Sequence, residues 1–331
     1  MSNKTRYFVA ISGAILVIGL GTGLVASYMG FPVSVFSSAA GPEELQYVPA
    51  DASVVAYANV RDVMSSQFRQ RFRELEPSSQ DKNEFEEKTG LNFEEDIDSV
   101  VAAVLGKTDL STKPHEGFLL LARGRFQAAR LEALALEHGA VIGDYQGKSI
   151  ITHHDNDNTN DTPADDMAVG FVEADLIAFG SVTAVHAAID ARRDNRNIVS
   201  NNDMMKLVNE IDNANAWAVG RFDAIASQAH LPAEVQNYMP AISWFSAATH
   251  VNGGVSGTLK AEAKDETSAQ NLRDVIQGVL AVAKLQSGNN AAVKIMADSL
   301  VLSGKGKTVA VAFTVPSELL DVIEGMAKGR K

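Results

Sequence analysis

The chain has 331 residues, with 41 acidic and 29 basic side chains, a formal net charge of −12 and no cysteine. Binding of nucleic acid needs clustered lysine and arginine, so this charge balance argues against a nucleic-acid partner. The lack of cysteine excludes disulfides, a thiolate nucleophile and cysteine-ligated metals. A chain of this length can nevertheless bury a large core, or two smaller ones.

Residues 7–29 contain no charged side chain. A helix of about 20 apolar residues is enough to cross the hydrocarbon core of a bilayer. Lys4 and Arg6 precede this run, and the next basic residue after it is Arg61. Every acidic residue lies after the run, from Glu43 onward. The positive-inside rule then predicts a cytoplasmic tail at 1–6, a transmembrane anchor at 7–29 in the bacterial inner (cytoplasmic) membrane, and a periplasmic main domain.

A cleaved signal peptide is the alternative to a retained anchor. Ser38-Ala39-Ala40 offers small residues of the kind that a signal peptidase recognises. The apolar region of a signal peptide is usually about 7–15 residues, which is shorter than this run. The length favours an uncleaved anchor, with cleavage after Ala40 left open.

The predicted anchor carries small residues at intervals of four, at Gly19, Gly23 and Ser27. In lipid, small side chains at this spacing let two helix backbones approach closely. The pattern predicts transmembrane packing on another membrane helix. The alternative is that glycine is simply more frequent in membrane helices than in soluble ones.

Residues 30–45 are rich in proline, glycine and serine and read as a linker. Beyond it, short β runs alternate with amphipathic helices, which predicts an α+β fold of mainly antiparallel sheet. We place one exported lobe at 46–165 and a second at 166–331. Hairpins are expected at 141–152, 169–179, 242–263 and 299–315, and Pro316 opens a last helix to residue 327. A long helix at 267–285 carries one apolar stripe, made of Leu272, Val275, Ile276, Val279, Leu280 and Ala283. We expect the first five of these side chains to be buried against the sheet.

The two lobes share short sequence patterns. Residues 55–62 and 217–223 each read as a strand that runs into an aspartate, and Gly124-Arg125-Phe126 repeats as Gly220-Arg221-Phe222. An aspartate at that point can cap the free N–H groups of a following helix. The patterns fit either two related lobes or shared strand-to-helix chemistry without common ancestry.

A family resemblance rests on the start and the end of the exported part. Val48-Pro49-Ala50-Asp51-Ala52 leads into the strand at 54–57 behind a single anchor. This arrangement resembles uncharacterised bacterial single-pass envelope proteins grouped as DUF3352. Residues 261–323 are similar to the end of such proteins. The resemblance implies an exported α+β domain and carries no catalytic residue across.

An acidic, asparagine-rich loop is the one candidate metal site. Its oxygen-bearing residues fall at positions 1, 3, 5, 7 and 12 of an EF-hand count: Asp155, Asp157, Thr159, Asp161 and Asp166. Asn160 replaces the glycine usual at position 6, and aspartate and asparagine also favour plain solvated turns. His153-His154 precedes the loop, but adjacent strand residues point to opposite faces and cannot chelate one ion together. We expect no cofactor besides this possible calcium.

No hydrolase, zinc-protease, phosphate-loop or dinucleotide motif follows a strand in the sequence. We therefore expect a non-enzymatic membrane-anchored protein that binds or scaffolds others, most concretely as an accessory subunit of a larger membrane complex. Its partners would be the bilayer and other transmembrane proteins, reached through the anchor. An exported domain for a lipid or other apolar ligand is the alternative, and an unrecognised carboxylate-based enzyme the third possibility.

Overall fold

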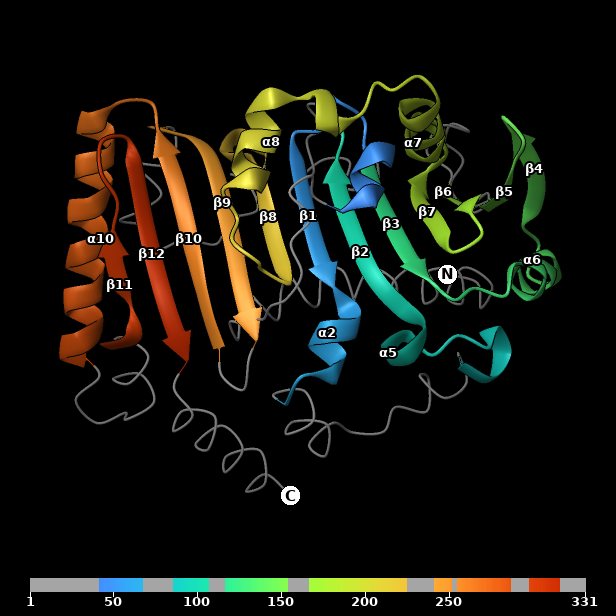
Figure 1. Cartoon of the computed structure of the whole chain (residues 1–331), viewed down its shortest axis with the longest axis horizontal. Helices are drawn as coiled ribbons and strands as arrows, with labels where there is room; N and C mark the ends of the chain where they lie inside the picture. Colours follow the sequence, from blue (N-terminus) through green and yellow to red (C-terminus); the bar gives the residue numbers. More distant parts are fainter. Residues whose placement is uncertain are drawn as a thin grey trace. The chain divides into compact units, whose positions relative to one another are not determined.

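The computed structural model describes residues 42–67, 86–106, 117–153, 167–224, 241–251, 255–286 and 298–315. In these ranges the chain forms antiparallel sheet with covering helices, so the predicted α+β class is confirmed (Figure 1). The chain divides into two compact units. Of the described residues, the first unit holds 42–61 and 86–209, and the second holds 62–67 and everything from Glu210 onward.

The sheet of the first unit pairs its strands antiparallel throughout. Its spatial order is β1 (Val54–Asn59), β2 (Ile97–Val104), β3 (Phe118–Gly124), β7 (Leu176–Ser181), β6 (Met167–Glu173), β5 (Lys148–His153) and β4 (Val141–Tyr145). Successive side chains of a strand point to opposite faces. Leu119, Leu120 and Leu121 are all buried, so both faces of β3 are covered.

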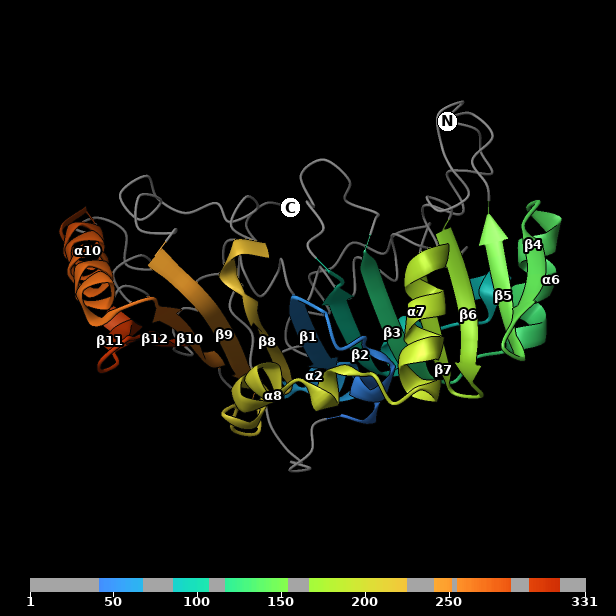
Figure 2. The ribbon, with the colours of Figure 1, turned by 90° about the horizontal axis from the view of Figure 1, so that it is seen from above.

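One face of this sheet is covered by α7 (Val182–Arg193), which packs on β3, β6 and β7 (Figure 2). The Ser181 hydroxyl caps the helix by accepting from the amide of Ala184. Glycine in the strands lets the helix lie close: a Cβ on Gly170 would stand 2.9 Å from Cγ1 of Val185. The first unit also contains the helices η1 (Glu43–Tyr47), α5 (Phe93–Asp96), α6 (Ala128–Glu137), η2 (Ile198–Ser200) and α8 (Asn202–Asn209).

Residues 42–45, which the sequence assigned to the linker, belong to the folded part of the first unit. We expected the linker to end at Leu45, but Leu45 lies inside η1 and is completely buried. The residue that follows η1, Val48, is also fixed in place: its carbonyl accepts a hydrogen bond from the amide of Ile198 at 2.7 Å. The closely spaced apolar residues Leu45, Tyr47 and Val48 explain the difference, since all three are buried. The folded part of the first unit therefore includes residues 42–45.

The division between the units also falls later than predicted. The sequence placed it between 165 and 166, whereas the structure places it between Asn209 and Glu210. Strand pairing explains this, because β6 pairs with β5 and β7 pairs with β3. Both strands thus belong to the first sheet, and α7 and α8 follow them.

The second unit has its own antiparallel strands in the order β11 (Val301–Ser303), β12 (Thr308–Val315), β10 (Val255–Ala263), β9 (Ile242–Val251) and β8 (Ala216–Arg221). The second unit also contains η3 (Phe222–Ala224) and α10 (Glu266–Gln286). The helix α2 (Val60–Ser65) belongs to both units, because the division falls between Arg61 and Asp62. The four predicted hairpins are confirmed as β4–β5, β6–β7, β9–β10 and β11–β12. The predicted Asn252-Gly253 turn lies outside the described residues, as does the predicted last helix.

The apolar stripe of α10 is less buried than its sequence predicts. Leu272 is buried, but Val275, Ile276, Val279 and Leu280 are only half-buried. Leu272 belongs to the core of the second unit with Phe222, Ile242, Ala263, Ala269 and Val309. The burial decreases along the helix, and Val282 is already 51% exposed.

This gradient gives a prediction for the second unit. Leu272→Ala should lower the free energy of unfolding by about 2–5 kcal/mol, because it opens a cavity in the core. Val282→Ala, on the same helix but half exposed, should change it by less than about 0.5 kcal/mol. Both tryptophans, Trp217 and Trp244, lie in this unit, so urea unfolding followed by tryptophan fluorescence measures the effect. Equal shifts for the two variants would contradict this packing.

The predicted anchor at 7–29 lies outside the described residues. Within the part of the chain that the structure describes, no helix has the length and apolar character needed to cross a membrane.

Candidate functional site

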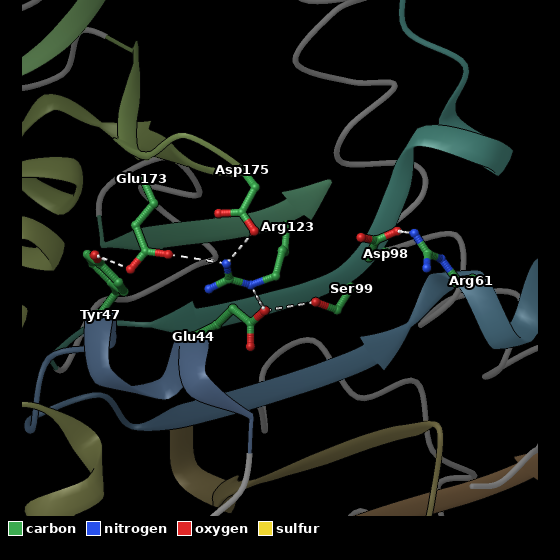
Figure 3. Close-up of polar contacts among 8 residues, drawn as sticks. All are labelled: Glu44, Tyr47, Arg61, Asp98, Ser99, Arg123, Glu173 and Asp175. Atoms are coloured by element: carbon green, nitrogen blue, oxygen red, sulfur yellow. Dashed lines mark hydrogen bonds and ion pairs between the residues drawn. The ribbon is translucent and has the colours of Figure 1, made fainter. Parts of the chain in front are cut away.

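A cluster of charged side chains surrounds Arg123, the second-last residue of β3. Its Nε donates to Oε1 of Glu44 at 2.6 Å, and its Nη1 donates to Oδ2 of Asp175 at 2.8 Å and to Oε2 of Glu173 at 3.2 Å (Figure 3). Glu44 comes from η1, Glu173 ends β6, and Asp175 lies in the turn to β7. One guanidinium thus joins three carboxylates from two separate parts of the first unit, η1 and the β6–β7 turn.

Glu44 is the most deeply placed member of this cluster, with a side chain only 5% exposed. The same carboxylate oxygen that accepts from Arg123 also accepts from the hydroxyl of Ser99 on β2, at 2.9 Å. A buried charge is tolerated only when it is paired and hydrogen-bonded. The two donors meet that requirement, and they fix η1 to both β2 and β3.

Tyr47 extends the cluster at the other end of η1. Its hydroxyl donates to Oε1 of Glu173 at 2.9 Å, and the guanidinium of Arg192 lies 5.9 Å from the centre of its ring. Burial, followed by the hydrogen bond to Glu173, raises the pKa of Tyr47 to about 12. Tyr47 therefore remains a phenol at every physiological pH.

Arg123 likewise keeps its proton. Burial by itself lowers the pKa of its guanidinium, but the hydrogen bonds and charges of Glu44 and Asp175 outweigh that effect and raise the pKa above its ordinary value. A general acid or base needs a pKa near the working pH. Neither Arg123 nor Tyr47 has one, so the arrangement fits a structural clamp that holds η1 on the sheet.

Other ion pairs at strand ends are more exposed. Arg61 pairs with Asp98 beside this cluster (Figure 3), and Arg125 pairs with Asp96 at 3.0 Å. Exposed pairs of this kind contribute about 0–1 kcal/mol. In the repeated Gly-Arg-Phe pattern, Arg125 thus bonds a residue distant in sequence, whereas Arg221 bonds Asp223 two positions away. The two arginines have different structural environments.

A second polar cluster ties β4 to α7. The hydroxyl of Tyr145 donates to Oδ2 of Asp190 at 2.8 Å, and its ring stacks on His186 with 3.6 Å between ring centres. The hydrogen bond to Asp190 raises the pKa of Tyr145. Burial lowers the pKa of His186, although the charge of Asp190 acts in the opposite direction. His186 is therefore neutral at neutral pH, and the cluster attaches an edge strand to its helix.

The residues singled out in the sequence lie elsewhere. The possible calcium ligands Asp155, Asp157, Thr159, Asp161 and Asp166, and the anchor residues Gly19, Gly23 and Ser27, fall outside the described residues. His154 does too, and His153 ends β5. Among the described residues, no group of three or more histidine, aspartate or glutamate side chains is placed to hold a metal ion.

Sequence reasoning missed every member of the Arg123 cluster. Glu44 lay in the predicted linker, and Glu173 and Asp175 lay within the hairpin expected at 169–179 without being singled out. One signal was available, because Arg123 ends the apolar run Phe118-Leu119-Leu120-Leu121-Ala122. A charge that ends a buried strand needs a partner.

The fold and this cluster define a class of protein: an α+β protein in which a short helix, η1, is clamped to the sheet by ion pairs. The chain belongs to the family described as "Protein of unknown function (DUF3352)", whose model matches residues 10–252, as the resemblance implied. No curated protein matches the chain. A solved structure titled "Structure of crystal form I of TP0453" is 13% identical, covers 85% of this chain and 96% of its own, and has a TM-score of 0.39. That similarity is too low to support a conclusion.

Proposed function

We propose that this protein is a non-enzymatic, membrane-anchored periplasmic protein that binds or scaffolds other proteins, as an accessory subunit of a larger membrane complex. The uncharged run at 7–29 carries the proposal, because Lys4 and Arg6 precede it and no basic residue follows until Arg61. The place of Pro42 within the folded part of the first unit supports it. The chain between 29 and 42 can span at most about 45 Å, so the domain would stay near the membrane surface.

The Arg123 cluster supports the non-enzymatic part of this proposal. Its Arg123 and Tyr47 do not change protonation near neutral pH, and its ion pairs hold structural elements together. The net charge of −12 favours a soluble domain that does not bind anionic lipid headgroups by charge. Attachment to the membrane would then depend on the anchor.

Labelling of single introduced cysteines tests the membrane topology. The chain has no cysteine of its own, so no other residue of the protein reacts with the label. In spheroplasts, a membrane-impermeant maleimide should label Lys305→Cys, in the exposed β11–β12 turn, and should leave Ser2→Cys unlabelled until the membrane is permeabilised. Labelling of both positions in intact spheroplasts, or a mature protein that starts at Gly41, would contradict a retained anchor with a cytoplasmic N-terminus.

The small-residue seam provides a test of complex formation. Gly23→Ile should keep the protein inserted but release it from its complex in mild detergent, because a bulky side chain separates the helix backbones. Leu20→Ile, away from the seam, should leave association unchanged. Wild-type protein that runs as a lone monomer, or a Gly23 variant that associates normally, would reject the subunit proposal. The alternative of an exported domain for an apolar ligand would then replace it.

A further inference from the structure

The strand β4 (Val141–Tyr145) lies at the end of the first unit's sheet (Figure 1). It pairs with β5 along one side, and no strand in the described part of the chain pairs with its other side. An unpaired strand edge presents a row of backbone N–H and C=O groups to which another strand can bind. The partner that fits depends on which groups β4 presents and on what surrounds them.

The turn between β4 and β5 determines which backbone groups point outward. Gln146 and Gly147 have φ values of +54° and +75°, as a two-residue type I′ turn requires. In such a turn the carbonyl of Tyr145 accepts from the amide of Lys148, which lies opposite it. Tyr145 and Lys148 are therefore a hydrogen-bonded pair of the β4–β5 ladder.

Hydrogen-bonded and non-hydrogen-bonded pairs alternate along two antiparallel strands, so Gly143 and Val141 also bond to β5. The hydroxyl of Thr152 in β5 agrees with this, because it donates to the carbonyl of Val141 at 3.4 Å. The amides and carbonyls of Ile142 and Asp144 therefore point to the open side of β4. The strand thus offers two donors and two acceptors to a neighbour.

The open side of β4 lacks the protection that edge strands usually have. Such strands are protected by lysine, proline, a β-bulge or a covering element. β4 has no lysine or proline, and its pairing with β5 is regular. Its one charged residue, Asp144, turns back to the loop, where Oδ1 accepts from the amide of Gly147 at 3.2 Å. Val141 is 65% exposed, and a Cβ on Gly143 would meet no atom within 4 Å.

The two neighbouring helices hold this hairpin by its two faces. On one face, the ring of Tyr145 stacks on His186 of α7 and its hydroxyl bonds Asp190. On the other face, the hydroxyl of Ser149 donates to Oε1 of Glu132 in α6 at 2.7 Å. The hairpin is therefore attached from both sides, and β4 is presented as a fixed edge.

We propose that β4 pairs antiparallel with β4 of a second copy of this chain, about a two-fold axis at Gly143. In this register Ile142 of each copy lies opposite Asp144 of the other. Both residues have outward-pointing groups, so four backbone hydrogen bonds can form. The exposed Val141 lies opposite Tyr145 of the second copy, and a β-branched residue opposite an aromatic one is a favourable cross-strand pair.

Neighbouring registers fit less well. A shift by one residue would place outward-pointing groups opposite groups that already bond to β5. A shift by two in one direction places Asp144 opposite Asp144 of the other copy, and like charges directly opposite each other are destabilising. A shift by two in the other direction leaves Tyr145 beyond the end of the second strand. β4 is thus complementary to itself in one register, which favours a second copy as the occupant. This inference goes beyond the proposed function and does not depend on the anchor.

Disulfide formation between single introduced cysteines tests this register in the full chain, in mild detergent. The two Cα atoms of a non-hydrogen-bonded pair lie about 4.5 Å apart, within the range that a disulfide bridges. Gly143→Cys should therefore form a linked dimer under mild oxidation at least tenfold faster than Val141→Cys. Val141 is the matched control, because it lies on the same face of the same strand and is exposed. In the proposed register its two copies lie four residues apart, about 14 Å.

Equal rates for the two variants, or no dimer from Gly143→Cys, would overturn the proposal. A Gly143→Cys thiol that resists a maleimide without forming a dimer would overturn it too, since a different strand would then cover the edge. Gly23→Ile, in the predicted anchor, should leave the Gly143→Cys cross-link in place. The self-pairing of β4 and the proposed subunit role can therefore fail separately.

A proline gives an independent test of the strand pairing. The amide of Ile142 points away from β5, so Ile142→Pro removes a donor on the open side and keeps the bonds between β4 and β5. Circular dichroism should show a folded chain. In the Gly143→Cys background, Ile142→Pro should slow dimer formation at least tenfold. A folded variant that cross-links at the original rate would overturn the proposal.

Discussion

Arg123→Ala is expected to lower the free energy of unfolding of the first unit by about 3–5 kcal/mol. The variant leaves the buried carboxylate of Glu44 without its cation, and the hydroxyl of Ser99 is too weak a partner to replace it. Both tryptophans lie in the second unit. Hydrogen exchange of peptides from β2 and β3 is therefore the measurement of choice, with far-ultraviolet circular dichroism for the whole chain.

Two comparisons make this result specific. The double variant Glu44→Ala with Arg123→Ala should be less destabilised than Arg123→Ala alone, because it leaves no unpaired buried charge. Arg125→Ala loses an exposed ion pair two positions away and should cost less than about 1 kcal/mol. If Arg123→Ala were no more harmful than Arg125→Ala, Glu44 would not be held as the structure places it.

Gly180→Ala should also destabilise the first unit, by about 1–3 kcal/mol or more. A Cβ at this position of β7 would stand 2.3 Å from the carbonyl oxygen of Phe118 on β3. A backbone atom paired in a sheet cannot move aside as the end of a flexible side chain can. The effect should appear as a lower urea midpoint by circular dichroism.

Gly143→Ala is the matched control, because Gly143 is also a strand glycine. A Cβ there meets no atom within 4 Å. Alanine should be neutral or slightly stabilising, since glycine in a strand loses more backbone freedom on folding. Similar losses for the two variants would show that the β3–β7 contact is not as close as described.

The fold could be predicted from the sequence wherever the signals are local. Hairpins such as β11–β12 follow from an apolar alternation around glycines that accept a positive φ, +109° at Gly304 and +56° at Gly306. The α10 stripe was visible for the same reason. The extent to which this stripe is buried could not be predicted from the sequence, because it depends on how many strands pack against the helix. The division between the units also depended on β3 pairing with β7, far along the chain.

The Arg123 cluster depends entirely on such distant contacts. Arg123 is 79 positions from Glu44, and Tyr47 is 126 positions from Glu173. No spacing rule joins residues at those separations. The sequence analysis instead singled out the aspartates at 155–166, because they are close to each other along the chain. A single sequence shows which residues are close along the chain but not which are close in space.

The clamp on η1 also determines how the first unit would respond to mechanical load. Tension on the chain ahead of Pro42 acts first on η1, and the Glu44–Arg123 bond passes it to β3. β3 pairs with β2 on one side and β7 on the other, so it cannot be peeled away as an edge strand can. The first event under load would be the loss of the Glu44 and Tyr47 bonds and the release of η1, with the sheet intact. The domain would thus yield by a short, reversible extension before its core is strained.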